Sequence, residues 1–356
     1  MATLYVASTE TFVGKSATCV ALLDRARRDG FAAGYLKPVS VSVTRTDTTV
    51  LDADAAFVQA HFALPDPLDT LAPVLLTPSV VEAVLAGQSP DFVRRLTVAY
   101  ARVARDRDLV LLEGANHWAE GSLVGLSTDQ VSDMLQAPVL LIARYRPPIT
   151  LDAILAVQRY LGDRLLGVII NSIDAPQLEF VRGRMVPFLE QRGIPVFATL
   201  PHDPQLAGVT VTDLYEHLGG QLLGNPAWGG QLVEHLLIGA MGANAALSHF
   251  RRRTHKAVIT GGDRVDLQLA ALETSTAVLV LTGNIQPVAA VLDRAEEREV
   301  AIIVVPDDTL TAVERAEGIF GQVRFKQAAK IARFTALLDA ACDFDRLYQA
   351  IGLTSG

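Results

Sequence analysis

A lysine and a serine near the N-terminus have the types and spacing needed to bind a phosphate group. Gly14, Lys15 and Ser16 stand between a short apolar run and the start of an amphipathic stretch. At a turn from a strand into a helix, free N–H groups and the helix dipole favour an anion. We therefore expect Lys15 to bind the terminal phosphates of a nucleotide, Ser16 to bind Mg²⁺, and Gly14 to let the backbone approach closely.

The pattern departs from a strict phosphate-loop motif, G-x-x-x-x-G-K-[ST], because Thr9 stands where that motif has its first glycine. The alternative interpretation is that Gly-Lys-Ser only starts a surface helix, with Lys15 solvated. The position of these residues, at the first turn from a strand into a helix, favours the phosphate interpretation.

The elements that must position this loop are apolar runs of strand length that alternate with longer amphipathic stretches. Continuous apolar strands separated by helices indicate a parallel sheet buried on both faces, so we predict an α/β fold. Ligands of such sheets bind at the carboxyl ends of the strands. The expected strands are 4–7, 32–36, 109–112, 139–143, 165–170 and 195–199, and the expected helices lie near 15–28, 90–106, 150–161 and 176–192.

Glycines cluster between residues 219 and 230, which is typical of a domain boundary. A second alternation follows, so we predict a domain over 1–215, a smaller α/β domain over 216–325 and a helical segment over 326–356. The length of 356 residues fits two domains. The second alternation has expected strands at 256–259, 277–281 and 301–305, and expected helices near 231–247, 263–273, 287–298 and 309–316.

Composition and charge argue against several classes of protein. Half of the residues are hydrophobic and 20% are charged, which is typical of a globular protein rather than a disordered one. The net charge of −8 argues against nucleic acid as a partner. No segment approaches the roughly 18 apolar residues of a membrane span, and no signal peptide pattern is visible. We therefore expect a cytoplasmic protein without a membrane partner.

The loop at residues 8–16, Ser-Thr-Glu-Thr-Phe-Val-Gly-Lys-Ser, resembles that of dethiobiotin synthetases, whose pattern is G-T-D-T-x-V-G-K-T. That family has a P-loop NTPase fold and couples ATP to the ring closure of a carbamate. Further matches follow in the same order along the chain, namely Lys37-Pro38-Val39, Asp54 in Leu-Asp-Ala-Asp-Ala, Glu113-Gly114-Ala115, Gly167-Val168-Ile169-Ile170-Asn171 and Leu200-Pro201-His202-Asp203-Pro204.

The resemblance implies ATP and Mg²⁺ as cofactors and assigns a role to each matching residue. If the chain is an enzyme, Lys15 and Lys37 are catalytic, with Lys37 at the carbamate and phosphate. The implied Mg²⁺ ligands are Ser16, Asp54 and Glu113. The implied nucleotide-binding residues are Thr11, Val13, Gly14, Lys15, Ser16, Asn171 at the adenine, and Pro201 in the loop that closes over the base.

Three of these residues also have simpler interpretations. Lys37 could be an ordinary exposed lysine, Asp54 a carboxylate favoured at a helix start, and Asn171 a turn residue at a strand end. Joint placement of all of them beside a phosphate loop favours the functional interpretation.

Differences from the family pattern fall on the substrate side of the expected site. Ser8 replaces the first glycine of the family's loop, Val41-Ser42 lacks the glycine that follows K-P-V, and Asn116-His117 replaces a glycine pair. These differences argue against dethiobiotin synthesis. ATP-dependent activation of another carboxylate or carbamate stays open.

Three polar turns follow the expected strands of the second domain, at residues 260–264, 281–284 and 305–309. Because the carboxyl ends of adjacent parallel strands share one edge, we expect a small ligand to bind there. The alternative is a tight glycine turn with positive φ, followed by a helix that Asp263 caps. The residues expected at this ligand are Gly261, Gly262, Asp263, Arg264, Thr282, Gly283 and Asp308.

This region resembles the DRTGG domain, whose turns read T-G-G-D-R, L-T-G-G and P-x-D-T, and Ile238-Gly239-Ala240-Met241 resembles the opening helix of that domain. Both halves together resemble the N-terminal portion of long phosphate acetyltransferases, which continue into an acetyltransferase domain. The resemblance implies a regulatory protein that binds ATP and Mg²⁺, senses a nucleotide or metabolite, forms homo-oligomers and works with an enzyme of acetate or acyl-phosphate metabolism. The alternative is an ATP-dependent ligase or ATPase, and acetyl transfer is not expected.

Overall fold

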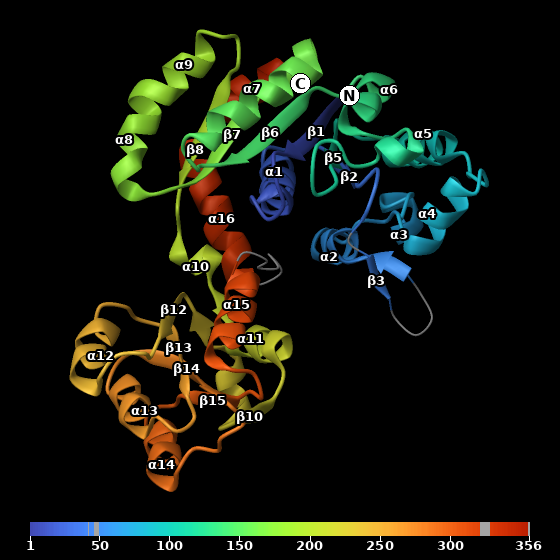
Figure 1. Cartoon of the computed structure of the whole chain (residues 1–356). Coiled ribbons are helices and arrows are strands. Elements are labelled where there is room, and N and C mark those ends of the chain that lie inside the picture. Colours follow the sequence, from blue (N-terminus) through green and yellow to red (C-terminus); the bar gives the residue numbers. More distant parts are fainter. Residues whose placement is uncertain (42, 46–49, 321–327, 355–356) are drawn as a thin grey trace. The chain divides into compact units, whose positions relative to one another are not determined.

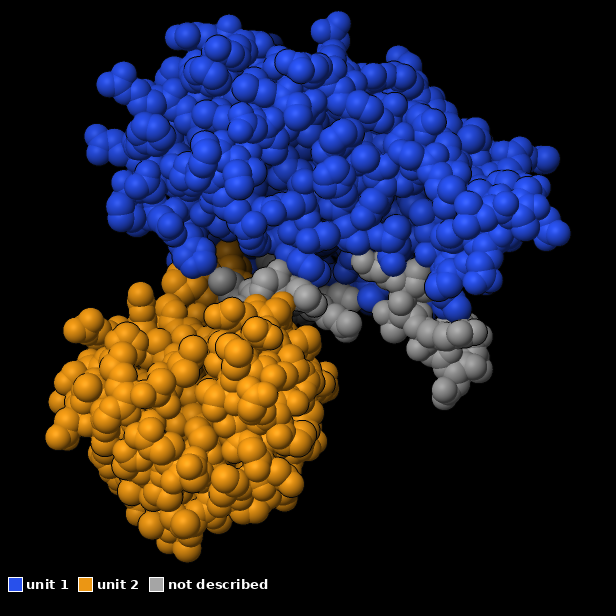
Figure 2. Space-filling view, viewed as in Figure 1, with its two compact units in different colours: residues 1–202, 325–356 blue, residues 203–324 orange. Residues whose placement is uncertain are grey.

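The computed structural model describes residues 1–41, 43–45, 50–320 and 328–354 (Figure 1). Two compact units divide the chain, one with residues 1–202 and 325–356 and one with residues 203–324 (Figure 2). The first unit thus contains the C-terminal helices, and the division at residue 202 lies before the glycine-rich stretch. The expected boundary at 215 stays a prediction.

A parallel sheet of six described strands forms the centre of the first unit, in the order β2-β5-β1-β6-β7-β8. Every residue of β1, β2 and β5 is buried, as expected for a parallel sheet covered on both faces. The predicted α/β fold is confirmed. The strands are β1 Ala2–Ser8, β2 Ala33–Leu36, β5 Leu109–Glu113, β6 Val139–Arg144, β7 Leu165–Ile173 and β8 Val196–Pro201, and the pair β3 Val43–Arg45 and β4 Val50–Asp52 lies outside this sheet.

Helices cover both faces of this sheet. The chain runs from β1 to β2 in one direction across the sheet and from β6 to β8 in the other, so right-handed crossovers place α1 and α7 on opposite faces (Figure 1). The order therefore reverses beside β1, and ligands bind at such a point. The helices of this unit are α1 Lys15–Arg28, α2 Ala53–Phe62, α3 Leu68–Leu71, α4 Pro78–Leu85, α5 Phe92–Val103, α6 Thr128–Leu135, α7 Ile149–Leu161, α8 Leu178–Phe180, α9 Val186–Glu190, α16 Ala328–Ala341 and α17 Phe344–Ala350.

The C-terminal helices pack against the N-terminal part of the chain. Helix α16 lies beside α1 and contacts β8, and it buries Phe334 and Leu338. Arg28 of α1 donates to Asp339 of α16 at 2.8 Å. The two residues are far apart in the sequence, so α16 completes the layer that α1 begins.

The described residues of the second unit form their own five-stranded sheet, in the order β10-β15-β14-β13-β12, and of these five strands only β10 is antiparallel. All residues of β14 and β15 are buried, which indicates helical cover on both faces. The strands are β10 Gln221–Leu223, β12 His235–Ile238, β13 Lys256–Gly261, β14 Thr276–Thr282 and β15 Ala301–Val304, with the separate pair β9 Val209–Thr210 and β11 Leu232–Val233. The helices are α10 Pro204–Ala207, α11 Val211–Leu218, α12 Ala243–Phe250, α13 Val265–Leu272, α14 Ala289–Glu297 and α15 Thr309–Phe320.

The prediction of a helix near 231–247 is wrong for the first half of that range. Strands β11 and β12 occupy residues 232–238, and helix α12 begins only at Ala243. The segment from Ile238 to Met241 therefore opens no helix. Residues 235–238 pair in parallel with β13, and a short apolar run of this kind fits a strand or a helix equally well before its partner is known.

Among the described residues, no helix combines the length and the apolar character needed to cross a membrane.

Candidate functional site

The loop between β1 and α1 presents groups that attract an anion. Gly14 has φ +94°, a left-handed conformation that glycine adopts without strain, and it precedes the first residue of α1. Within the described residues, the N–H groups of Val13 and Gly14 form no hydrogen bond. The ammonium of Lys15 also has no hydrogen-bond or ion-pair partner there. Burial lowers the pKa of Lys15, and the nearby carboxylate of Glu113 acts in the opposite direction.

Two side chains from neighbouring strands hold this loop. Arg144, the last residue of β6, donates a hydrogen bond to the carbonyl oxygen of Phe12. Asn171 of β7 donates from Nδ2 to the carbonyl oxygen of Val13 at 2.8 Å. A Cβ atom at Gly14 would lie 2.7 Å from this Nδ2 atom, so the position requires glycine for space as well as for its φ.

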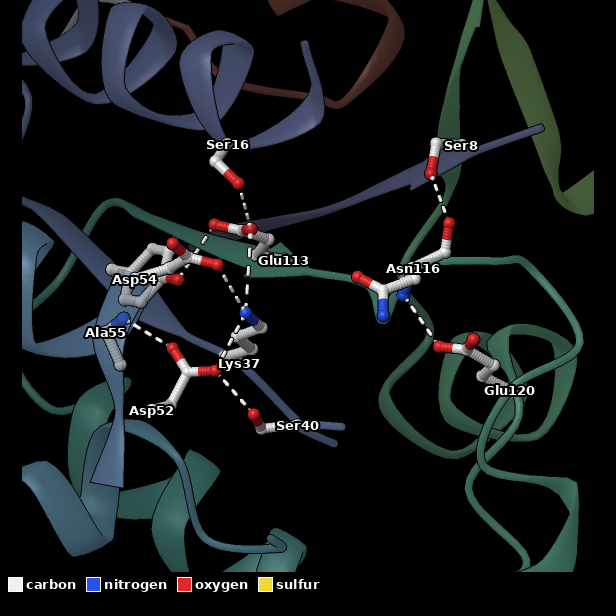
Figure 3. Close-up of polar contacts among 11 residues, drawn as sticks. Ser8, Ser16, Lys37, Ser40, Asp52, Asp54, Ala55, Glu113, Asn116 and Glu120 are labelled. Carbon is white, nitrogen blue, oxygen red and sulfur yellow. Dashed lines mark hydrogen bonds and ion pairs between the residues drawn. The ribbon is translucent and has the colours of Figure 1, made fainter. Parts of the chain in front are cut away.

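Glu113 is the last residue of β5 and is fully buried. Its carboxylate accepts hydrogen bonds from two hydroxyl groups (Figure 3). Ser16 donates from Oγ to Oε1 at 2.6 Å, and Tyr35 donates from its hydroxyl to Oε2 at 2.8 Å. Lys37 Nζ lies 4.0 Å from Oε1. Strands β2, β5 and β1 are neighbours in the sheet, so their carboxyl ends bring these side chains together.

Lys37 follows β2, and carboxylates surround its buried ammonium (Figure 3). Its Nζ lies 2.9 Å from Oδ2 of Asp52 and 2.9 Å from Oδ2 of Asp54. Burial alone would lower the pKa of Lys37, but the carboxylates of Glu113, Asp54 and Asp52 together raise it above its ordinary value. Lys37 is therefore held as a cation, and the alternative of an ordinary exposed lysine is wrong.

Asp52, Tyr35 and Ser40 belong to this cluster but are absent from the predicted site residues. Asp52 accepts from Ser40 Oγ and also caps the start of α2 by accepting from a backbone N–H at 2.6 Å. The spacing of Asp52 and Asp54 is a usable signal, since both carboxylates stand where a strand meets a helix. Tyr35 gives no such signal, because it stands inside an apolar strand and its pattern indicates only core packing.

The three turns predicted to bind a ligand in the second unit lie side by side. Gly262 donates from its N–H to the carbonyl oxygen of Thr282 at 3.1 Å, and Gly283 donates to that of Asp307 at 2.9 Å. The hydroxyl groups of Thr282 and Thr309 lie 2.9 Å apart. The carboxyl ends of β13, β14 and β15 therefore do form one rim.

Several polar groups of this rim are already paired within the unit. Arg264 forms an ion pair with Asp266 at 2.9 Å, and Asp308 accepts backbone N–H groups at the start of α15. Arg264, not Asp263, occupies the N-cap position of α13, and no side chain in the described part of the chain caps that helix. The expected cap at Asp263 is therefore wrong. The role of the rim as a ligand site stays a prediction.

Comparison with families of known proteins matches an AAA domain over residues 2–210 and a DRTGG domain over residues 213–319. The chain belongs to the AAA domain family. Its AAA domain is 27% identical over 208 residues to the ATP-dependent dethiobiotin synthetase BioD of Xylella fastidiosa, covering 57% of this chain and 92% of that protein. The predicted resemblances to dethiobiotin synthetases and to the DRTGG domain are confirmed.

The whole chain is 25% identical over 365 residues to the phosphate acetyltransferase of Nitratidesulfovibrio vulgaris, covering 97% of this chain and 51% of that protein. The chain thus spans about half the length of this relative. A solved structure of the CBS and DRTGG domains of the regulatory region of Clostridium perfringens pyrophosphatase, complexed with the activator diadenosine tetraphosphate, matches with a TM-score of 0.27 and 17% identity, covering 41% of this chain and 73% of that chain.

Oxygen ligands suited to Mg²⁺ meet beside the loop of the AAA domain. Within the described ranges, no group of three or more His, Cys, Asp and Glu side chains is arranged to hold a metal ion by itself. However, Mg²⁺ usually keeps several waters and is shared with phosphate oxygens, so the Ser16 hydroxyl and the Glu113 and Asp54 carboxylates fit it. Asp52, Asp54 and Glu113 outnumber the ammonium groups of Lys37 and the nearby Lys15, and a bound cation would offset the remaining negative charge.

The other predicted residues of the AAA domain lie near the same edge of the sheet. Both ends of the Asn171 amide are engaged, because its Oδ1 also accepts from the N–H of Ser172 at 2.7 Å. Pro201 ends β8 and pairs with Ile173 of β7, and Thr11 is exposed in the loop.

Two residues that replace glycines of the dethiobiotin synthetase pattern contact each other in the AAA domain. Ser8 donates from Oγ to the carbonyl oxygen of Asn116 at 3.1 Å, and the N–H of Asn116 donates to Glu120 at 2.8 Å (Figure 3). Ser8 thus makes a side-chain contact that glycine could not make, whereas Asn116 takes part through its backbone.

Proposed function

We propose that the AAA domain binds ATP with Mg²⁺ at residues 8–16 and that the protein is regulatory, sensing this nucleotide or a related metabolite. The observation that carries the proposal lies at the N-terminus of α1, where the ammonium of Lys15 and the N–H groups of Val13 and Gly14 have no partner among the described residues. These groups together attract a phosphate chain. Ser16 and Glu113, 2.6 Å apart, supply the Mg²⁺ side of the site.

Two features support the regulatory role. They are the second domain of the chain and the sequence differences on the expected substrate side of the AAA domain. A DRTGG domain follows the AAA domain, and the glycines of the dethiobiotin synthetase pattern are replaced by Ser8, Asn116 and His117. The similarity to half of a phosphate acetyltransferase supports an enzyme of acetate or acyl-phosphate metabolism as the partner and a homo-oligomeric assembly. A small-molecule effector would bind the rim of the second unit.

The test of nucleotide binding is titration calorimetry of the full chain with ATP and Mg²⁺. We expect binding by the natural protein and its abolition in Lys15→Ala, because the loop then lacks its only side-chain cation. Arg94→Ala is the control, since it also removes one positive charge, from an exposed position in α5. Unchanged affinity in Lys15→Ala contradicts this site.

The second candidate function is an ATP-dependent ligase or ATPase acting on a carboxylate or carbamate. The observation that favours it is the buried cation Lys37 in the same cluster as Ser16 and Glu113. Phosphate release from ATP, alone and with candidate carboxylates or amines, distinguishes the two functions. Tight binding without turnover supports the regulatory role, whereas multiple turnovers that are lost in Glu113→Gln overturn it.

A further inference from the structure

Arg144 and Asn171 are register partners in the parallel pair β6 and β7. Their side chains donate to the carbonyl oxygens of Phe12 and Val13, two consecutive residues of the phosphate loop. Two adjacent strand ends therefore fix two adjacent peptide groups of the loop.

Fixing these carbonyl groups also fixes the N–H groups of the same peptides. Each peptide unit is planar and trans, so its N–H points away from its C=O. The carbonyl of Phe12 shares a plane with the N–H of Val13, and the carbonyl of Val13 shares one with the N–H of Gly14. Since these carbonyls point to Arg144 and Asn171, both N–H groups point to the opposite side, and neither has a partner in the described part of the chain.

The loop needs this support because its backbone is unfavourable on its own. Phe12 has φ +54°, a conformation that a bulky residue rarely adopts. The side chain of Phe12 is also 54% exposed, so packing contributes little to holding it. The hydrogen bond from Arg144 to its carbonyl oxygen therefore supports this conformation.

We propose that Arg144 and Asn171 are positioning residues that preset the loop for a phosphate chain, and that Asn171 acts through the loop and not on the nucleotide base. This rests on the proposed nucleotide site and specifies its ligand class. The site recognises the phosphate chain itself, so inorganic tripolyphosphate is a ligand as well as ATP.

The test compares ATP and tripolyphosphate, each with Mg²⁺, by calorimetry on the full chain. Asn171→Ala and Arg144→Ala should each lower the affinity for ATP and for tripolyphosphate by the same factor. We expect about a tenfold loss, because one hydrogen bond to the loop is removed. Arg159→Ala is the control and should change affinity little, because Arg159 is exposed on α7 and, among the described residues, its side chain makes no hydrogen bond or ion pair with the loop. Loss of affinity for ATP alone in Asn171→Ala shows a base contact and overturns the proposal.

A second measurement keeps the proposal testable if no ligand binds to the natural protein, an outcome that defeats the proposed function. Thr18 donates from its N–H to the carbonyl oxygen of Gly14 at 2.8 Å, so hydrogen exchange at Thr18 reports on the start of α1 without any ligand. Exchange should be faster in Asn171→Ala and Arg144→Ala than in the natural protein and in Arg159→Ala. Equal exchange in all four proteins overturns the proposal, whatever the nucleotide experiments show.

Discussion

Asp52 lies 2.9 Å from the ammonium of Lys37, and the side chains of both are almost completely buried, with 0% and 4% exposure. Asp52 also caps α2, so one carboxylate fixes both the lysine and the helix that carries Asp54. The position of the Lys37 ammonium thus depends on Asp52, a residue outside the phosphate loop.

Replacement of Asp52 by Asn should lower the free energy of unfolding by about 2–4 kcal/mol, because it removes one partner of a buried ion pair. Asp54→Asn is the matched control. We expect a smaller loss, since Asp54 is 33% exposed and water screens its interaction with Lys37. Urea unfolding of the full chain measures the free energy of unfolding of both variants. Equal losses in the two variants contradict the larger contribution assigned to Asp52.

Gly14→Ala should weaken ATP binding at least tenfold and lower the free energy of unfolding by about 1–3 kcal/mol. The added Cβ would lie 2.7 Å from Asn171 Nδ2, at a φ of +94°. Gly183→Ala is the control, because nothing lies within 4 Å of its added Cβ and its φ is not positive. Calorimetry measures the ATP affinity of both variants, and urea unfolding measures their stability. Normal ATP binding by Gly14→Ala refutes the assigned loop conformation.

Ser16→Ala should reduce ATP affinity in the presence of Mg²⁺ by about tenfold or more and change it little when a chelator removes the metal. The reason is that the Ser16 hydroxyl lies beside Glu113, where the metal would be held. Ser248→Ala, on α12 of the other unit, is the control. A loss of the same size with and without metal indicates that Ser16 contacts only phosphate.

Phe334→Ala should lower the free energy of unfolding of the first unit by about 3–5 kcal/mol, the range for a buried Phe replaced by Ala. Its side chain is 3% exposed, and one ring carbon lies 3.7 Å from the Cβ position at Gly14, so nucleotide affinity should fall as well. Phe180→Ala is the comparison, because that ring is 54% exposed and should contribute little. Thermal unfolding with and without ATP measures both variants.

We expect Lys256 to make the stability of the second unit depend on pH. It is fully buried, donates to the carbonyl oxygen of Ser275 at 2.7 Å, and has a pKa lowered by burial to about 8. A lowered pKa for a base means that the charged form destabilises the folded state. This cost is fully present below pH 8 and is relieved as the pH rises from 8 to the ordinary value of 10.5.

We therefore expect the free energy of unfolding of the second unit to rise by about 1–3 kcal/mol over this interval, and Lys256→Met to remove the rise. Urea unfolding between pH 7 and pH 10.5 measures the slope for both proteins. Parallel pH profiles rule out Lys256 as the cause.

The local sequence was sufficient to predict the alternation of strands and helices, the start of α1 at Lys15 and the phosphate loop before it. These features depend on neighbours along the chain, namely on apolar runs of strand length and on Gly-Lys-Ser at a turn into a helix. It also placed Lys37 and Glu113 at strand ends, and parallel strands bring their carboxyl ends to one edge. Asp54 stands instead in the first turn of α2 and reaches the site through Lys37.

Other features depended on contacts between residues that are distant in the sequence. Arg144 reaches Phe12 only because β6 lies beside β1, and Tyr35 reaches Glu113 only because β2 lies beside β5. Strand β12 is a strand because β13 pairs with it. In each case the local pattern fits more than one arrangement, and the tertiary structure selects the one that pairs the buried polar groups.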